Sequence, residues 1–85
     1  MAIEILYFAW VREQIGTGQE RITPPPVLES VADLVDWLAT TSERHARAFA
    51  DRDRLRAAVD QVFVGMDAPI AGAREIAIFP PVTGG

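Results

Sequence analysis

The chain has 85 residues, of which 49% are hydrophobic and 24% are charged, so we expect one compact domain rather than a disordered segment. A chain of this size buries roughly 60–65% of its unfolded surface, which argues against a large catalytic cleft. Twelve acidic and eight basic residues give a net charge of −4 without a basic run, and there is no cysteine. This composition argues against nucleic-acid binding and excludes disulfides, thiolate metal sites and cysteine nucleophiles.

No apolar run approaches the roughly 20 residues that a membrane-spanning helix needs. Residues 1–4 lack the basic and then apolar character of a secretion signal. The sequence therefore predicts a cytoplasmic protein that has no membrane partner.

Residues 3–10 predict a strand with two apolar faces, which is typical of a central position in a sheet. A short helical turn at 11–15 is expected to stop at Gly16, and a glycine-containing turn then leads into a polar strand at 19–23. Three prolines at 24–26 end this strand, so we expect it at the edge of the sheet.

The main helix is predicted over about residues 30–40, where Ser30 and Asp33 come close to a capping box. A second short helix is predicted over 43–50, with Ser42 as its cap, and a charged turn follows it. His45 is the only histidine, and because no partner is evident in the sequence we expect a solvated surface residue.

Strands are predicted again at 55–61, 62–65 and 75–79. The order of two strands, a helix and further strands predicts an α+β fold of the β-grasp type. Its mixed sheet of about five strands would have the main helix across one face and the last strand beside the first. We expect a domain over 1–79 and an extended tail over 80–85.

Alternation assigns the residues of this sheet to two faces. The helix-covered face is expected to hold Ile3, Ile5, Tyr7, Val62, Val64, Ile76 and Ile78. The opposite face then holds Phe8, Phe63 and Phe79 with Leu6 and Ala77, an apolar patch that predicts a protein interface. A register shift of one residue would reverse this assignment, and phenylalanines folded over the sheet edge are the other alternative.

The final residues, 79–85, read Phe-Pro-Pro-Val-Thr-Gly-Gly. The prolines stop the last strand and stiffen the chain as it leaves the sheet, while the glycines make an end thin enough for a narrow tunnel in a partner. The carboxylate of Gly85 is a poor electrophile, and the chain has no nucleotide-binding loop, so a separate ATP-using enzyme would have to activate it. The alternative is an ordinary frayed terminus.

Other candidate sites are weaker. Asp33 and Asp36 are expected to be cap and surface residues rather than a catalytic pair, and Trp10 and Trp37 packing or rim residues. We therefore expect no active site and no metal site within the chain itself.

The sequence resembles the small, sulfur-carrying subunit of molybdopterin synthase (MoaD type), a ubiquitin-like family. The resemblance runs through residues 7–9 (Tyr-Phe-Ala), 11–13 (Val-Arg-Glu), 58–61 (Ala-Val-Asp-Gln) and 79–85, and the last motif is the specific one. Asp60 is a departure, because the family often has Asn there; only a local hydrogen bond depends on it.

The resemblance implies a subunit that is not an enzyme on its own and binds no cofactor. An adenylating enzyme similar to the ubiquitin-activating enzymes would use ATP to join AMP to Gly85, and a sulfur donor protein would replace AMP to leave a thiocarboxylate. The tail would then enter the large catalytic subunit and give its sulfur to cyclic pyranopterin monophosphate, in a heterotetramer of two small and two large subunits.

The family's docking phenylalanines map onto Phe8, Phe63 and Phe79. The resemblance further implies that the tail residues contact the partner: Pro80, Pro81, Val82, Thr83 and Gly84.

Three alternatives remain open. A thiazole-pathway sulfur carrier shares the Gly-Gly end, but the Phe-Pro-Pro lead-in and the second helix disfavour it. A ubiquitin-like modifier would be joined to target lysines through Gly85. A plain interaction domain would have an inert terminus.

Overall fold

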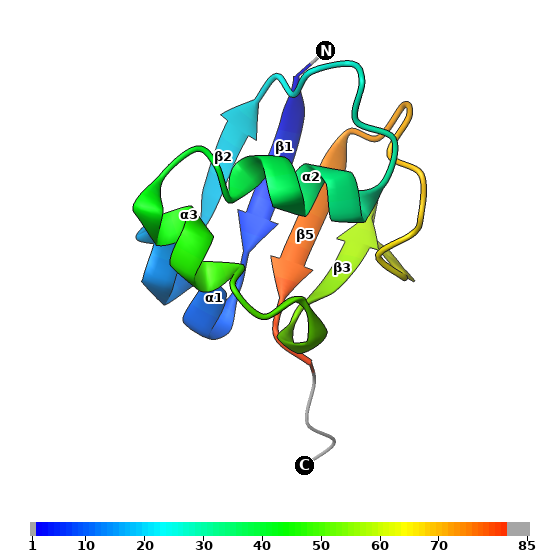
Figure 1. Ribbon diagram of the computed structural model, residues 1–85. Coiled ribbons are helices and arrows are strands. Elements are labelled where there is room, and N and C mark those ends of the chain that lie inside the picture. Colours follow the sequence, from blue (N-terminus) through cyan, green and yellow to red (C-terminus); the bar gives the residue numbers. More distant parts are fainter. Residues whose placement is uncertain (1, 82–85) are drawn as a thin grey trace.

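The computed structural model describes residues 2–81 and shows a five-stranded sheet with helices against one face (Figure 1). The strands are β1 (Ile3–Tyr7), β2 (Gln19–Ile22), β3 (Arg56–Val59), β4 (Val62–Val64) and β5 (Glu75–Phe79). The helices are α1 (Ala9–Ile15), α2 (Val31–Leu38), α3 (Glu43–Ala48) and the 3₁₀ helix η1 (Arg52–Arg54).

The strand order is β2-β1-β5-β3-β4, and the first and last strands of the chain pair in parallel at the centre. The other neighbours are antiparallel, so the sheet is mixed. The predicted β-grasp architecture and the edge position of the polar strand are both confirmed.

Helix α1 differs from the prediction, which had only a short turn at 11–15. It begins at Ala9, whose φ of 54° turns the chain directly from β1 into a helix. Gly16 ends it in the left-handed conformation at φ 95°, and its N–H donates to the carbonyl of Arg12. The described residues thus form three α-helices, not two.

The main helix begins as its sequence predicts. The Ser30 hydroxyl accepts a hydrogen bond from the Asp33 N–H at 3.2 Å, and Asp33 Oδ2 accepts one from the Ser30 N–H at 3.3 Å. This reciprocal pair is a capping box, because each side chain satisfies a backbone donor that the first helical turn leaves free.

The core lies between the sheet and α2. Ile5 and Ile78 from the central strands are fully buried against a helical stripe that includes Leu34 and Leu38. Each such side chain stabilises the fold by about 1.5–3 kcal/mol relative to full exposure.

The prediction for Val62 needs a correction, since this residue was expected on the covered face but is 62% exposed. It lies on the edge strand directly after the hairpin turn, where burial is incomplete.

Figure 1 shows the chain entering β1 at one end of the molecule and leaving β5 at the other. Pro80 and Pro81 follow β5 without regular secondary structure, and the predicted tail residues 82–85 lie outside the described residues. Within the described part of the chain, no helix has both the length and the apolar character needed to cross a membrane.

Candidate protein-docking site

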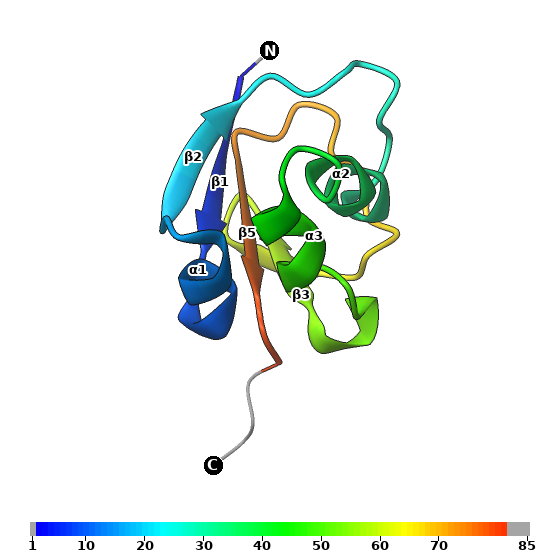
Figure 2. The same ribbon diagram turned by 60° about the vertical axis from the view of Figure 1, so that its left-hand side comes forward.

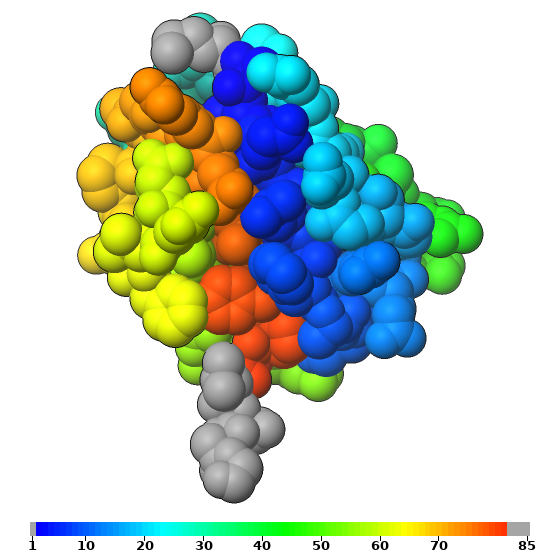
Figure 3. Space-filling view, turned by 180° about the vertical axis from the view of Figure 1, so that it is seen from behind, coloured from blue at the N-terminus to red at the C-terminus, as the bar shows by residue number. Residues whose placement is uncertain are grey.

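The sheet face opposite α2 carries an open hollow of about 490 Å³ at the end where β5 finishes. Figure 3 shows this face from behind, where residues of β4, β5 and β1 are exposed at the surface and no helix lies across them. We call this feature the apolar hollow; its lining residues are Phe8, Ala9, Ala58, Phe63, Ala77, Phe79, Pro80 and Pro81.

The floor of the apolar hollow follows from strand register. Ala58 lies directly opposite Ala77 on β5 and also opposite Phe63 on β4. Directly opposed residues of paired strands share a face, and Leu6 completes the row beside Ala77. Two alanines at the centre of the row leave a depression, because their side chains end at Cβ while their neighbours rise above them.

The walls of the apolar hollow are aromatic. The ring centroids of Phe63 and Phe79 lie 5.5 Å apart with an angle of 44° between the planes. Phe63 is 77% exposed and Phe8 is 48% exposed, so much of this aromatic surface faces solvent. A contiguous apolar patch of this kind on a small protein is typical of a site that another protein covers.

The apolar surface occupies only one end of the face. At the other end Glu4 of β1 lies beside Glu75 of β5 in the parallel register, and Glu4 faces Arg21 of β2. Next to Phe79, Arg56 is held by hydrogen bonds from its Nη1 to the carbonyls of Asp53 and Leu55. The hollow is therefore bounded by charged residues along the sheet.

The structure brings together every predicted docking residue that it describes: Phe8, Phe63, Phe79, Pro80 and Pro81. The remaining predicted site residues, Val82, Thr83, Gly84 and Gly85, lie outside the described residues. For all of these predicted site residues, described or not, binding to a partner stays a prediction. Sequence reasoning missed Ala58, which only the β3–β5 pairing places beside Ala77.

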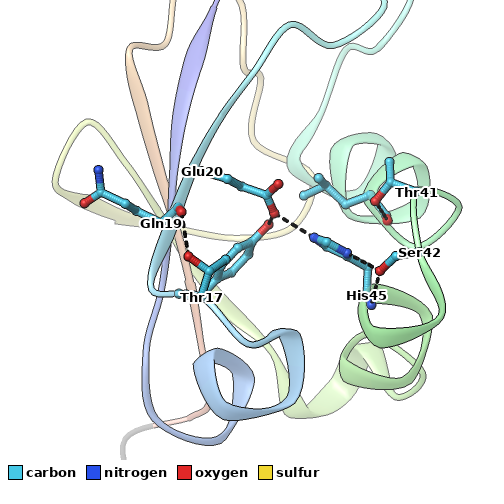
Figure 4. Close-up of polar contacts among 8 residues, drawn as sticks. Thr17, Gln19, Glu20, Thr41, Ser42 and His45 are labelled. Carbon is cyan, nitrogen blue, oxygen red and sulfur yellow. Dashed lines mark hydrogen bonds and ion pairs between the residues drawn. The ribbon is translucent and has the colours of Figure 1, made fainter.

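His45 is a second correction, because it is 9% exposed rather than solvated. Its Nε2 lies 2.6 Å from Glu20 Oε2 and its Nδ1 lies 2.6 Å from the Ser42 hydroxyl (Figure 4). The Tyr7 hydroxyl donates to the same Glu20 oxygen at 2.6 Å. Packing of α3 over the sheet brings these residues together from distant parts of the chain, which no local sequence pattern indicates.

These four residues form a polar network between α3, β1 and β2. Burial, with the hydrogen bond to Glu20 as a second cause, raises the pKa of the Tyr7 hydroxyl far above its ordinary value. Ser42 also caps α3 by accepting from the His45 N–H at 3.1 Å, so we interpret the network as structural. Among residues 2–81 there is no group of three or more histidine, aspartate or glutamate side chains placed to hold a metal ion.

Together these features define a ubiquitin-like β-grasp domain with an apolar hollow at the point where the chain leaves its last strand. The chain belongs to the ThiS family, whose profile matches residues 5–85. The molybdopterin synthase sulfur carrier subunit of Escherichia coli is 42% identical to it over 84 residues, which are 98% of this chain and 99% of that protein. The protein of the same name from Haemophilus influenzae is 30% identical over 83 residues, with the same two shares.

Two solved structures share the whole fold. SAMP1 from Haloferax volcanii superposes with a TM-score of 0.74 at 26% identity, and the match covers 100% of both chains. A putative molybdopterin converting factor, subunit 1, from Pyrococcus furiosus gives a TM-score of 0.71 at 26% identity over 96% of this chain and 99% of that one. Both neighbours agree with the β-grasp assignment.

Proposed function

We propose that this protein is the sulfur carrier subunit of a molybdopterin synthase in molybdenum cofactor biosynthesis. The observation that carries the proposal is the 42% identity to the Escherichia coli subunit of that name along almost the full length of both chains. The apolar hollow at the root of the C-terminal segment supports it, because a carrier needs a surface that partners hold while its end reacts.

In this proposal Gly85 carries the cargo. An adenylating enzyme uses ATP to convert its carboxylate into an acyl-adenylate and releases pyrophosphate. Hydrosulfide supplied by a donor protein then attacks the acyl carbon, and AMP leaves, so that a thiocarboxylate remains. Activation is required because an ionised carboxylate resists nucleophilic attack, whereas AMP is a good leaving group. Gly84 and Gly85 present no side chain that would obstruct this chemistry.

The loaded tail then enters the large subunit, where its sulfur passes to cyclic pyranopterin monophosphate. Three phenylalanines beside the start of the tail form the contact between the two subunits: Phe8, Phe63 and Phe79. Pro80 and Pro81 direct the chain away from the sheet. The chain supplies the sulfur-bearing group and the large subunit supplies the catalytic residues. We propose a cytoplasmic heterotetramer of two subunits of each kind.

Mass spectrometry of the intact protein tests this proposal. Protein purified from a host that contains its activating enzyme and sulfur donor should include a species heavier by the replacement of one oxygen atom with sulfur. Fragmentation should place that change on Gly85. A host without the activating enzyme provides the control, and failure to find the sulfur-containing species in the first host would contradict the proposal.

A second candidate function is that of a protein modifier. It is favoured by the structural likeness to SAMP1 from Haloferax volcanii, whose name stands for small archaeal modifier protein 1. A modifier would appear in its own host as higher-mass conjugates through an amide bond at Gly85. Conjugates without any thiocarboxylate would favour this function over the carrier.

A further inference from the structure

A second surface borders the chain exit on the helical side of the molecule. A groove of about 420 Å³ lies among α1, α3 and η1, and we call it the arginine groove. Its lining includes Trp10, Gln14, Arg47, Asp51 and Arg54. Figure 2 shows α1, α3 and the light-green turn that contains η1 gathered near the end of the molecule where β5 runs out.

The arginine groove and the apolar hollow are neighbours along the chain. Ala9 lines the hollow and Trp10 lines the groove, so two consecutive residues at the start of α1 join the surfaces. A protein that holds the end of β5 from outside therefore meets an apolar surface on one side and a cationic groove on the other.

The cations of the groove are available to a partner. Arg47 and Arg54 are exposed, and neither has a carboxylate within ion-pair distance among residues 2–81; Arg52 instead pairs with Asp36 at 2.8 Å. The guanidinium carbon of Arg54 lies 5.0 Å from the centroid of the Trp10 ring, which holds this cation over the indole. Asp51 is the acidic group in the lining, and its Oδ1 accepts from the Asp53 N–H.

Charge is distributed unevenly over the whole molecule. Segments 9–18 and 42–56, which contain α1, α3 and η1, hold six of the eight arginines but only four of the twelve acidic residues. The chain as a whole has a net charge of −4, whereas the side chains of these two segments together carry six positive and four negative charges, which is a net charge of +2. Such a separation of charge orients a protein as it approaches a complementary surface.

We propose that the arginine groove docks an acidic segment of the protein that receives the tail. The inference rests on the proposed function, under which that protein is the large subunit. Guanidinium groups match carboxylates by paired hydrogen bonds, and charges at the rim of an interface mainly accelerate and orient association. A carboxylate-bearing segment is favoured over nucleic acid because the rest of the chain is acidic and repels a long polyanion.

The test is the rate of association with the purified large subunit from the same organism, measured by stopped-flow fluorescence at low and high salt. The double variant Arg47→Gln/Arg54→Gln should associate about tenfold more slowly at low salt and show a weaker salt dependence. Arg47→Gln alone leaves the stacking on Trp10 intact and should show part of the effect. The control is Arg21→Gln/Arg74→Gln, which removes the same charge at the far end of the sheet.

Equal association rates for the two double variants would overturn the inference. So would tight binding of a single-stranded DNA oligonucleotide that the groove variant loses, because the groove would then serve a polyanion. If the wild-type chain does not bind the large subunit at all, the proposed function fails together with this inference. Binding that is tight but independent of salt contradicts the inference alone.

Discussion

The ring of Phe63 on edge strand β4 packs 5.5 Å from the ring of Phe79 at the end of β5, across the alanine that β3 places between their strands. The two rings contact each other at the edge of the apolar hollow, and Phe63 keeps most of its surface in solvent. Their contact is therefore a surface feature whose loss costs the free domain little.

If the proposed function holds, Phe63→Asp should weaken binding of the large subunit by about 2–4 kcal/mol, because a charge would replace an exposed aromatic side chain of the apolar hollow. Calorimetry measures the affinity, and thermal unfolding should show the free domain almost unchanged. Val27→Asp is the matched control, since Val27 is 76% exposed and lines a different surface, beside Trp37. Equal affinities for the two variants would remove Phe63 from the docking site.

Removal of Gly84 and Gly85 should abolish sulfur transfer while the free energy of unfolding changes by less than about 0.5 kcal/mol, because glycine has no side chain to bury. A reconstituted assay with the activating enzyme, sulfur donor and large subunit measures the transfer. Gly85→Ala keeps a terminal carboxylate at the same chain length, so its residual activity separates the need for a thin end from the need for the acyl group. A large drop in melting temperature on the deletion would contradict the prediction.

The only tyrosine should resist ionisation until the protein unfolds. Burial and Glu20 raise the pKa of Tyr7 above its ordinary value of 10.0, so the folded state holds this proton more tightly than the unfolded state. The resulting stability is complete below about pH 10 and is lost as the pH rises further. Ultraviolet titration of tyrosinate should coincide with the loss of circular dichroism. An ordinary midpoint with the fold intact would show that the hydroxyl is not buried, and Tyr7→Phe should remove this contribution to alkaline unfolding.

His45→Ala should destabilise the domain by about 2–3 kcal/mol, because it leaves Glu20 and Ser42 without their ring partner in a largely buried network. Urea unfolding followed by fluorescence measures the change. Arg44→Ala on the same helix is the control, since that side chain is exposed and should cost less than about 0.5 kcal/mol. If the two variants unfold at the same urea concentration, the network contributes nothing to stability.

Gln61→Gly should stabilise the domain by about 0.5–1 kcal/mol. Asp60 and Gln61 form the two-residue turn between β3 and β4 with φ values of 48° and 72°, a left-handed conformation that favours glycine.

Asp60→Asn is the companion variant and should leave the free energy of unfolding nearly unchanged. Asp60 Oδ1 accepts from the N–H groups of Arg74 and Glu75 at 2.9 and 3.0 Å, and an amide oxygen can do the same. Destabilisation by Gln61→Gly would contradict this account of the turn.

Sequence alone predicted the sheet, its faces and the aromatic cluster, because alternation in β1 and β5 and the cap of α2 are local signals. The bounds of β5 match the predicted range 75–79. Phe8 and Phe79 both line the apolar hollow because the fold class pairs the first and last strands of the sequence in parallel.

What sequence could not predict depends on contacts between distant residues. His45 is buried because α3 packs over β2, where Glu20 supplies a partner 25 positions away. Val62 is exposed because β4 lies at the sheet edge, where alternation no longer guarantees cover. Ala9 begins a helix with a positive φ that its residue type disfavours. In each case tertiary packing decided against the local preference.

Parallel pairing of β1 with β5 also has a practical result. Since both strands run the same way, the amino end of β1 and the carboxyl end of β5 lie at opposite poles of the domain (Figure 1). An affinity tag, fluorophore or surface tether joined ahead of Ile3 would therefore stay clear of the pole where Phe79 and Pro80 emerge. Protein labelled in this way leaves both the apolar hollow and the arginine groove unobstructed for the binding measurements described above.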